Sequence, residues 1–519
     1  MTSDRRREFI WVTLASLVIL AVANIPYVLA FTRGDGLVFG GALLAVPDGY
    51  SYLAKMQLGA SGAWLYTLRF TTDPGPGVLL FTFYIALGQL ARLTGLGVVA
   101  TYHAARLLAS LFFLLTAYHV IRPLAADSRR RMRLWGLFAL SSGLGWLVTP
   151  LTGALSPDLW VAESIPLLSL IANPHFPLAW ALVLWLLYTA LPAWSGPTVT
   201  ARLWRVAGLS LVLGEVYPMA LPIVLGVIGV SAALIGWERR AWPLAEIKIG
   251  AAATIVAAPR LVYTAWIVAT HPQIASWNAQ NSSPSPEWPL ALAWGGVPLV
   301  LAGIAAWRVF RARPVAEQNR IWIVWLVVGV VGLYAPYDLQ RRLSLGLMFP
   351  IAMLAAEGWR ALIEAPGVKR WQTPVRVVLG LGLTLSNLLV WAGARAAALG
   401  NDPEIFLQPA EARAIGALTA NDVVLAAPEL GGFIPTRSLA RVVFGHAAET
   451  PHADVMRQVV EGFYAGRVPA DAVVHEYGIT RVFYGPREAA IGPMPGLPAA
   501  WRLLSVDDGL RVFGPEASP

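Results

Sequence analysis

The sequence has 519 residues, of which 57% are hydrophobic and only 13% charged, and its mean hydropathy is +0.59. Soluble domains carry about a quarter of charged residues, so this composition excludes a soluble globular protein and indicates a polytopic membrane protein. The formal net charge is +9, but most Lys and Arg stand in short clusters between apolar runs. Such clusters are typical of cytoplasmic loops, and we therefore expect no nucleic-acid partner. The sequence contains no cysteine, which excludes disulfides and thiolate metal sites.

The first apolar segment, 9–31, follows the basic cluster Arg5–Arg7. It is long enough to span a bilayer of about 30 Å, so we expect an uncleaved helix with its N-terminus inside the cell. A cleaved signal peptide is the alternative, because Ala21-Val22-Ala23 has the small residues of a cleavage site. The continuation of the apolar run to Phe31 favours the membrane helix.

The arginine-rich loop 127–133 is expected inside, which allows only one of the two preceding apolar segments to cross the membrane. We expect 99–122 to cross and 76–93 to lie at the interface. The remaining crossings are expected at residues 134–151, 169–192, 205–218, 219–237, 244–268, 289–310, 320–334, 343–363 and 374–396. This arrangement gives about eleven transmembrane helices in the cytoplasmic membrane and places every later basic cluster inside.

The composition changes after residue 396. We expect residues 1–396 to form a membrane domain and residues 397–519 to form a small soluble α/β domain on the outer face, a mainly α fold overall. Short buried strands are predicted at 421–428, 441–445 and 481–486, and a helix at 453–463.

The first outer loop, 32–98, is unusually long, and loops of that kind tend to be functional. Asp48 in this loop could act as a general base on an acceptor hydroxyl or amine, although an Asp before Gly-Tyr-Ser could equally be a helix N-cap. Asp73 is a candidate second acid or metal ligand, with a turn residue as the alternative. Further candidates for lining a substrate cavity are Tyr50, Tyr52, Lys55 and His175.

Gln340, Arg341 and Arg342 are predicted outside, at the start of an apolar helix, against the positive-inside trend. Because Arg binds phosphate bidentately, we expect these residues to bind a phosphate-bearing lipid headgroup. Snorkelling to the lipid surface, or an ion pair with Asp338, is the alternative. Glu215, at the outer end of its helix, is a second candidate acid or metal ligand.

His446 and Glu449 follow a predicted strand of the outer domain, and we expect them to be structural or to face the acceptor. The sequence has no Walker motif, no dinucleotide-binding glycine pattern and no HExxH metal motif. Nucleotide-driven transport is therefore disfavoured.

The segments 47–54, 78–91 and 102–110 give an outer loop with an Asp, an interfacial helix and an Arg-containing helix start. In this order, followed by an outer soluble domain, they resemble the GT-C superfamily of integral membrane glycosyltransferases, which includes protein O-mannosyltransferases and lipid A aminoarabinose transferases. Gly49 stands where the family's commonest motif has a Glu after the Asp.

The resemblance implies transfer of a hexosyl or pentosyl group from a polyprenyl-phosphate-linked donor to an acceptor on the outer face, which is a protein, lipid or glycan. It gives Asp48 the position of the catalytic base and assigns the donor phosphate to Gln340, Arg341 and Arg342. A divalent cation is used by some members, so a metal requirement stays open. We expect the carboxylate and the two guanidinium groups to face a common extracytoplasmic cavity.

Two other functions remain open from the sequence. A transporter or lipid flippase would favour paired inverted repeats, and the sequence has no such pairing. A non-catalytic membrane assembly protein would use its outer domain to bind a partner.

Overall fold

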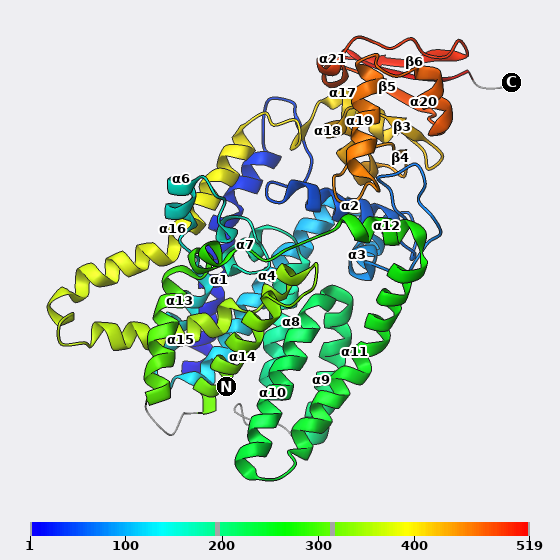
Figure 1. The fold of residues 1–519 in the computed structure, drawn as a ribbon. Coiled ribbons are helices and arrows are strands. Elements are labelled where there is room, and N and C mark those ends of the chain that lie inside the picture. Colours follow the sequence, from blue (N-terminus) through cyan, green and yellow to red (C-terminus); the bar gives the residue numbers. More distant parts are fainter. Residues whose placement is uncertain (1–2, 192–197, 312–316, 517–519) are drawn as a thin grey trace. The chain divides into compact units, whose positions relative to one another are not determined.

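The computed structural model describes residues 3–191, 198–311 and 317–516 (Figure 1). The chain forms two compact units. Unit 1 comprises residues 1–25, 105–263 and 283–394, and unit 2 comprises residues 26–104, 264–282 and 395–519.

Unit 1 is helical, and every expected crossing contains an α-helix. Its helices, some of which continue into unit 2, are α1 (Ser3–Phe31), α4 (Val98–Ile121), α5 (Ser128–Leu140), α6 (Gly145–Thr152), α7 (Pro166–Ile171), α8 (His175–Ala190), α9 (Val199–Val216), α10 (Leu221–Arg239), α11 (Leu244–Thr270), α13 (Trp288–Arg311), α14 (Glu317–Leu333), α15 (Met348–Ile363) and α16 (Gln372–Leu399). Seven helices of the described chain are long and apolar enough to span a membrane. The mainly α, multi-pass membrane architecture is thus confirmed, whereas the number of about eleven crossings stays a prediction.

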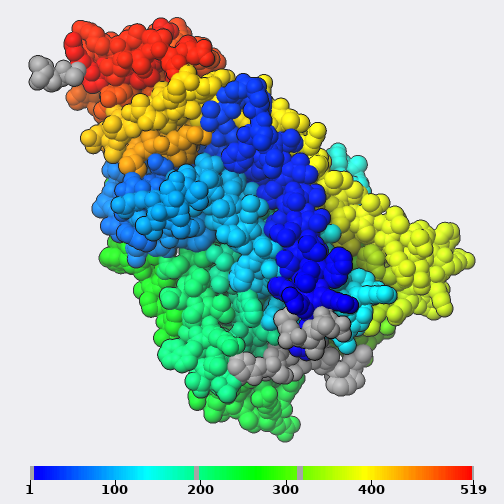
Figure 2. All heavy atoms as spheres, turned by 180° about the vertical axis from the view of Figure 1, so that it is seen from behind, coloured from blue at the N-terminus to red at the C-terminus, as the bar shows by residue number. Residues whose placement is uncertain are grey.

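Exposed apolar side chains run along the N-terminal helix. Figure 2 shows α1, in dark blue, uncovered along this face of the molecule. Its large apolar residues with at least 40% of their surface exposed are Phe9, Ile10, Trp11, Leu14, Leu17, Val18, Val22, Ile25, Val28 and Phe31. An apolar surface of this length fits lipid rather than water.

Three expected helices are interrupted. The crossing 169–192 is divided between α7 and α8, and the other two interruptions are satisfied inside the protein. The chain unwinds between α5 and α6, where the Leu144 amide donates to the carbonyl of Ala293 (2.7 Å) and the Gly145 amide donates to the buried carboxylate of Asp158 (3.0 Å). α13 is kinked at Gly296, whose φ of 52° suits glycine. Non-helical backbone at membrane depth is tolerated only with such internal partners, which an apolar sequence pattern does not reveal.

α13 and α15 pack with their backbones in close approach. A Cβ atom added at Gly358 of α15 would lie 1.9 Å from the carbonyl oxygen of Leu301 on α13. Small residues at helix contacts in membranes allow this spacing, and the gain is van der Waals packing.

Unit 2 combines short helices of the first outer loop with the C-terminal α/β segment. The elements before residue 400 are β1 (Val38–Phe39), α2 (Val46–Ala60), α3 (Thr82–Thr94) and α12 (Pro272–Gln280). The expected interfacial segment 76–93 corresponds to α3, which begins six residues later than predicted. A short pairing of β1 with β2 (Phe406–Leu407) is antiparallel.

A five-stranded sheet with the order β4-β3-β5-β7-β6 organises the C-terminal segment, drawn in yellow to red in Figure 1. Its strands are β3 (Val423–Leu425), β4 (Arg441–Val442), β5 (Arg481–Tyr484), β6 (Trp501–Asp507) and β7 (Leu510–Pro515), and its helices are α17 (Pro409–Gly416), α18 (Pro428–Arg437), α19 (Ala453–Tyr464), α20 (Ala470–Glu476) and α21 (Pro486–Ile491). The first three strands are parallel, whereas β6 and β7 form an antiparallel hairpin. The small α/β domain, its three predicted strands and the helix at 453–463 are confirmed.

The C-terminal segment shares its hydrophobic core with α2. Leu53 and Met56 of α2 belong to the same buried cluster as Leu430 and Phe433 of α18. Close backbone contact is also present: a Cβ at Gly432 would lie 3.4 Å from the ring of Tyr50. The domain boundary at 396/397 stays a prediction, and within unit 2 the packing continues across it.

Candidate functional site

The first turn of α2 carries an exposed carboxylate, that of Asp48. α2 begins at Val46, and Ala45 is its N-cap with φ 46° and no side-chain cap hydrogen bond. Asp48 therefore lies in the first turn rather than at the cap, so the N-cap alternative is wrong. Its side chain is exposed and makes no hydrogen bond or ion pair with any described residue. The helix dipole favours a negative charge at this position, and the carboxylate is open to solvent.

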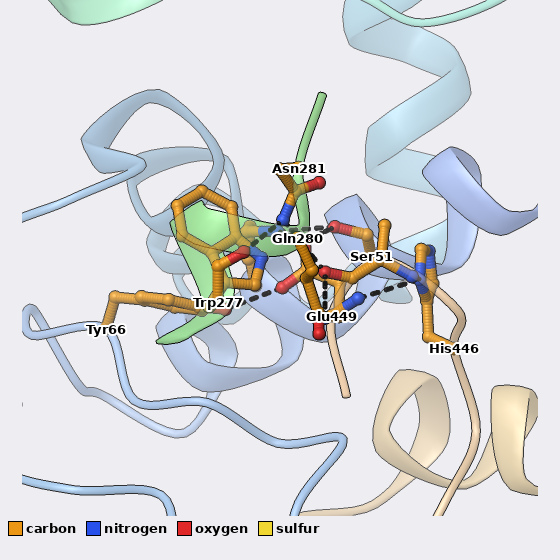
Figure 3. A network of polar contacts seen from close by, with 9 residues as sticks. Ser51, Tyr66, Trp277, Gln280, Asn281, His446 and Glu449 are labelled. Atoms are coloured by element: carbon orange, nitrogen blue, oxygen red, sulfur yellow. Dashed lines mark hydrogen bonds and ion pairs between the residues drawn. The ribbon is translucent and has the colours of Figure 1, made fainter. Parts of the chain in front are cut away.

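Two turns further along, the same side of α2 carries a buried ion pair. The Lys55 ammonium lies 2.7 Å from Oε1 of Glu449 and has 2% of its side-chain surface exposed. Ser51 donates to the same carboxylate oxygen, and the Tyr66 hydroxyl donates to Oε2 (2.9 Å) (Figure 3). The Phe81 ring lies 4.2 Å from the Lys55 nitrogen. Each charge thus has partners that compensate for its removal from water.

These partners control how Glu449 ionises. Burial opposes ionisation, but the charge of Lys55, the nearby His446 and the donated hydrogen bonds lower the pKa of Glu449 to about 2. Conversely, burial and the adjacent Glu449 raise the pKa of the Tyr66 hydroxyl well above its usual value of 10. At neutral pH the centre of the network is therefore a carboxylate that accepts hydrogen bonds from a neutral phenol.

The imidazole of His446 organises the loop that carries Glu449. Its Nδ1 accepts hydrogen bonds from the backbone amides of Ala448 (2.9 Å) and Glu449 (3.0 Å), which leaves the ring proton on Nε2. Burial lowers the pKa of His446, while the carboxylates of Glu449 and Asp48 oppose that effect. We conclude that this histidine is neutral at physiological pH and fixes the loop conformation.

The end of α12 holds the same loop from another side. The amide of Gln280 donates to the carbonyls of Ala448 (3.1 Å) and Thr450 (2.7 Å), and Asn281 donates to Ala448 (2.9 Å) (Figure 3). In return, the His452 amide donates to the side-chain oxygen of Gln280 (3.1 Å). Residues 446–452 are therefore bound by both α2 and α12.

Several predicted cavity residues of the outer loop are instead core residues. Tyr50 is buried, its hydroxyl donates to the carbonyl of Glu404, and its ring lies 4.7 Å from that of Phe433. Tyr52 is half-buried and stacks on Tyr84 at 4.2 Å. Lys55 is buried as described, so both Tyr50 and Lys55 join α2 to its surroundings, and their place in a cavity wall stays a prediction.

Asp73 occupies a turn. Its Oδ1 accepts from the Gly75 amide (3.4 Å), and its Oδ2 accepts from the side chain of Gln273 on α12 (2.9 Å). Gly75 has φ 64°, a value that favours glycine. The geometry agrees with the turn alternative that the sequence left open.

The predicted phosphate-binding residues lie in unit 1, in a 3₁₀ turn at Gln340–Ser344 rather than in an α-helix, because α15 begins only at Met348. The Arg341 guanidinium lies 4.3 Å over the ring of Trp160, and its Nε is 3.9 Å from Glu163. Its charge is thus partly balanced by Glu163, whereas the sequence suggested Asp338 as the alternative partner.

Its neighbours in the turn are also engaged. The Arg342 Nε donates weakly to Ser283 (3.4 Å), and the Arg342 carbonyl accepts from the Tyr217 hydroxyl (3.1 Å). The Gln340 amide faces the carbonyls of its own loop, to which it can donate. Among the three, Arg341 retains the most freedom to bind an anion.

The remaining candidates of unit 1 have protein partners. Glu215 lies 3.5 Å from the guanidinium of Arg260. His175 is buried, and its ring lies 3.9 Å from that of Phe176 and 5.8 Å from that of Tyr217. Among the described residues, no three His, Asp or Glu side chains gather into a cation site. A divalent cation at Asp73 or Glu215 therefore stays a prediction.

Sequence reasoning missed the Lys55–Glu449 network. The signal in the sequence was the pair Ser51 and Lys55, two polar residues four apart on the otherwise apolar face of α2. Their partner is 394 positions away, and no local pattern identifies a contact at that separation.

No family model matches the chain, and no curated protein matches it. Solved structures do. ArnT from Cupriavidus metallidurans bound to undecaprenyl phosphate is similar with a TM-score of 0.54 and 15% identity, over 98% of each chain. The apo state of the same protein gives a TM-score of 0.51 and 13% identity, over 96% of this chain and 98% of that one. Arabinofuranosyltransferase AftD from Mycobacteria gives a TM-score of 0.48 and 16% identity, over 97% of this chain and 41% of that one.

ArnT is an aminoarabinose transferase of the GT-C class. Because the likeness to it extends over nearly the whole of both chains, the GT-C fold that the sequence suggested is confirmed. At this level of identity the likeness establishes the fold, and the activity has to be argued from the residues.

Proposed function

We propose that this chain is a membrane glycosyltransferase that moves a sugar from a polyprenyl-phosphate-linked donor to an acceptor on the extracytoplasmic side. The observation that carries the proposal is Asp48, an exposed carboxylate that makes no hydrogen bond or ion pair with a described residue. It lies in the first turn of a helix that a buried ion pair binds two turns further along. The fold similarity to a transferase bound to undecaprenyl phosphate supports the class of donor.

In the proposed reaction, Asp48 accepts the proton of the acceptor's hydroxyl or amine. The acceptor atom attacks the anomeric carbon of the sugar, and the bond between that carbon and the phosphate oxygen breaks. The donor leaves as a polyprenyl phosphate that carries the additional negative charge. A single displacement of this kind inverts the configuration of the sugar.

Arg341 and Arg342 are proposed to stabilise the departing phosphate. Stabilisation of developing charge by preorganised cations is usually a large contribution to catalysis. The stacking of Arg341 on Trp160 holds the guanidinium plane, while its ion pair at 3.9 Å is long enough to be exchanged for a phosphate oxygen. The sugar is proposed to be a hexose or a pentose.

The assay incubates purified full-length protein with a panel of labelled polyprenyl-phosphate sugars and with cell-envelope extracts as acceptors. We expect Asp48→Asn to reduce transfer by about a hundredfold or more, since general-base catalysis contributes about 10²–10⁴-fold. Thermal unfolding should change little, because the side chain makes no hydrogen bond or ion pair with a described residue and loses only its favourable interaction with the helix dipole. The matched control is Asp471→Asn, an exposed acid in the first turn of α20, which should leave transfer intact.

Two results would contradict the proposal. One is transfer by Asp48→Asn at more than half the rate of the unmodified protein. The other is the absence of transfer from every donor of the panel by a protein that is folded and reconstituted in lipid.

The absence of cysteine permits a separate test of the expectation that Asp48 and Arg341 face one cavity. Cysteines introduced at the two positions should be joined by a short bifunctional maleimide. Failure of the two cysteines to be joined, with both single cysteines labelled normally, would refute the expectation.

A further inference from the structure

A groove opens between α10 and α11. The two helices are joined by the short turn Arg240–Pro243, yet they make little direct contact along their length. The groove between them has a volume of about 760 Å³. Its walls are mainly apolar and small, and a Cβ at Gly229 would meet no atom within 4 Å.

Small residues on neighbouring membrane helices normally allow the helices to approach closely. Here the space they leave stays open, and only 17% of the apolar stretch of α11 is buried inside the protein. A lipid-facing groove of this width and composition suits a hydrocarbon chain, because burying apolar surface is its main source of affinity.

The mouth of the groove carries an unpaired cation. Arg240 ends α10 with φ 49° and lines the groove. Its side chain is exposed and makes no ion pair with a described residue. Trp237 and Trp242 are 85% and 83% exposed. Exposed tryptophans beside a basic turn are typical of the membrane interface, so the mouth lies at headgroup level and the groove in the hydrocarbon layer.

A buried carboxylate lines the same groove. Glu246, in the first turn of α11, is 7% exposed and makes no hydrogen bond or ion pair within the part of the chain that the structure describes. Arg202 is near enough to interact electrostatically, but its guanidinium already donates to the carbonyls of Thr189 (3.0 Å) and Ala190 (2.7 Å). The carboxylate oxygens of Glu246 are not sealed off, so a donor bound in the groove that Glu246 lines can pair with them.

We propose that this groove is a binding site for an aminophospholipid of the phosphatidylethanolamine class. The acyl chain occupies the apolar groove, Arg240 binds the phosphate, and Glu246 accepts hydrogen bonds from the primary ammonium group. A phosphatidylglycerol headgroup offers Glu246 no cation, and the quaternary ammonium of phosphatidylcholine has no N–H to donate. The presence of both a cation and an acid in one groove therefore selects a zwitterion with a protonated amine. This site is independent of the proposed transferase activity.

The test is native mass spectrometry of the delipidated full-length protein with phosphatidylethanolamine, phosphatidylglycerol and phosphatidylcholine of identical acyl chains. We expect the first lipid to bind about fivefold to tenfold more tightly than the other two, as a charge-assisted hydrogen bond implies. Glu246→Gln should remove this preference, and Arg240→Gln should weaken the binding of all three lipids. Gly229→Leu, whose Cβ meets no atom within 4 Å, adds a side chain to the groove wall and should also weaken the binding of all three lipids.

Control variants carry the same changes outside the groove. Glu287→Gln and Arg308→Gln alter exposed residues and should leave the preference intact. A size-exclusion profile and a thermal melt verify that each variant is folded. Equal binding of the three lipids, tighter binding of phosphatidylglycerol, or a preference that survives Glu246→Gln would overturn the proposal.

Discussion

Replacement of Glu449 by Gln tests whether the buried ion pair holds α2 to the loop 446–452. The change keeps the shape of the side chain but removes its charge. The Lys55 ammonium, 2% exposed, would then keep a hydroxyl and aromatic rings but lose its carboxylate. Removal of one partner of a buried pair costs about 3–5 kcal/mol, because the other charge is left uncompensated.

The pKa of Glu449 gives a second, independent value for the free energy that the ionised carboxylate contributes to stability. The difference between an ordinary value of 4.5 and about 2 in the folded protein corresponds to about 3 kcal/mol of stabilisation. Because the folded-state pKa is the lower one, this stabilisation is complete above pH 4.5 and is lost as the pH falls through 2. We expect about 2 kcal/mol of it to disappear between pH 6 and pH 3.

Hydrogen–deuterium exchange in detergent measures the local opening free energy of residues 46–60 and 446–452. For Glu449→Gln, a loss of about 3 kcal/mol corresponds to roughly hundredfold faster exchange of these amides at pH 7. In the unmodified protein the same amides should lose protection towards pH 3, after correction for the intrinsic exchange rate. The double variant Lys55→Met, Glu449→Gln should recover much of the loss, because no buried charge remains.

Glu461→Gln is the matched control, since Glu461 pairs with Arg457 on the surface of α19 and its side chain is 36% exposed. A surface pair of this kind contributes about 0–1 kcal/mol, so its loss should change exchange little. The reasoning would be refuted if Glu449→Gln exchanged no faster than this control, or if the unmodified protein kept full protection down to pH 3.

Three further changes test other parts of the structure. His446→Gln removes the ring nitrogen that accepts two backbone amides, and we expect about fivefold faster exchange in its loop, from the loss of about 1 kcal/mol. Gly358→Ala places a Cβ 1.9 Å from the Leu301 carbonyl and should lower the free energy of unfolding by about 1–3 kcal/mol, seen as a lower melting temperature. Arg106→Met removes a 1% exposed guanidinium that donates to the carbonyl of Leu170 (3.1 Å) and the carboxamide of Asn24 (2.7 Å), and the loss of these hydrogen bonds should cost about 1–3 kcal/mol in the same melt.

The glycine prediction has an internal control on the same pair of helices. A Cβ at Gly303 of α13 meets nothing within 4 Å, so Gly303→Ala should stabilise the protein slightly, by about 0.5–1 kcal/mol, through helix propensity. Equal changes in the free energy of unfolding for Gly358→Ala and Gly303→Ala would contradict the close approach of α13 and α15. Unchanged exchange in His446→Gln, or an unchanged melt in Arg106→Met, would likewise contradict the hydrogen bonds assigned to them.

The helical segments were predictable because each is long and apolar, and the bilayer demands that its backbone be satisfied within the segment. The β6–β7 hairpin was missed although Asp508-Gly509, with φ 44° and 83°, is a typical two-residue hairpin turn. Its strand β6 is mostly exposed and lacks the alternation of a half-buried strand. Asp48 could be identified as a candidate base, but only the start of α2 at Val46 separated that role from a helix cap.

By itself the sequence determined that this is a multi-pass membrane protein with an α/β segment at its C-terminal end, because hydropathy and strand patterns act locally along the chain. The tertiary structure decided which polar residues are exposed to solvent and which are bound to protein partners. Lys55 and Asp48 lie on the same short helix, yet one is buried against a carboxylate 394 positions away and the other is exposed. The difference arises from the free energy of removing each charge from water, which depends on partners that only the fold brings together.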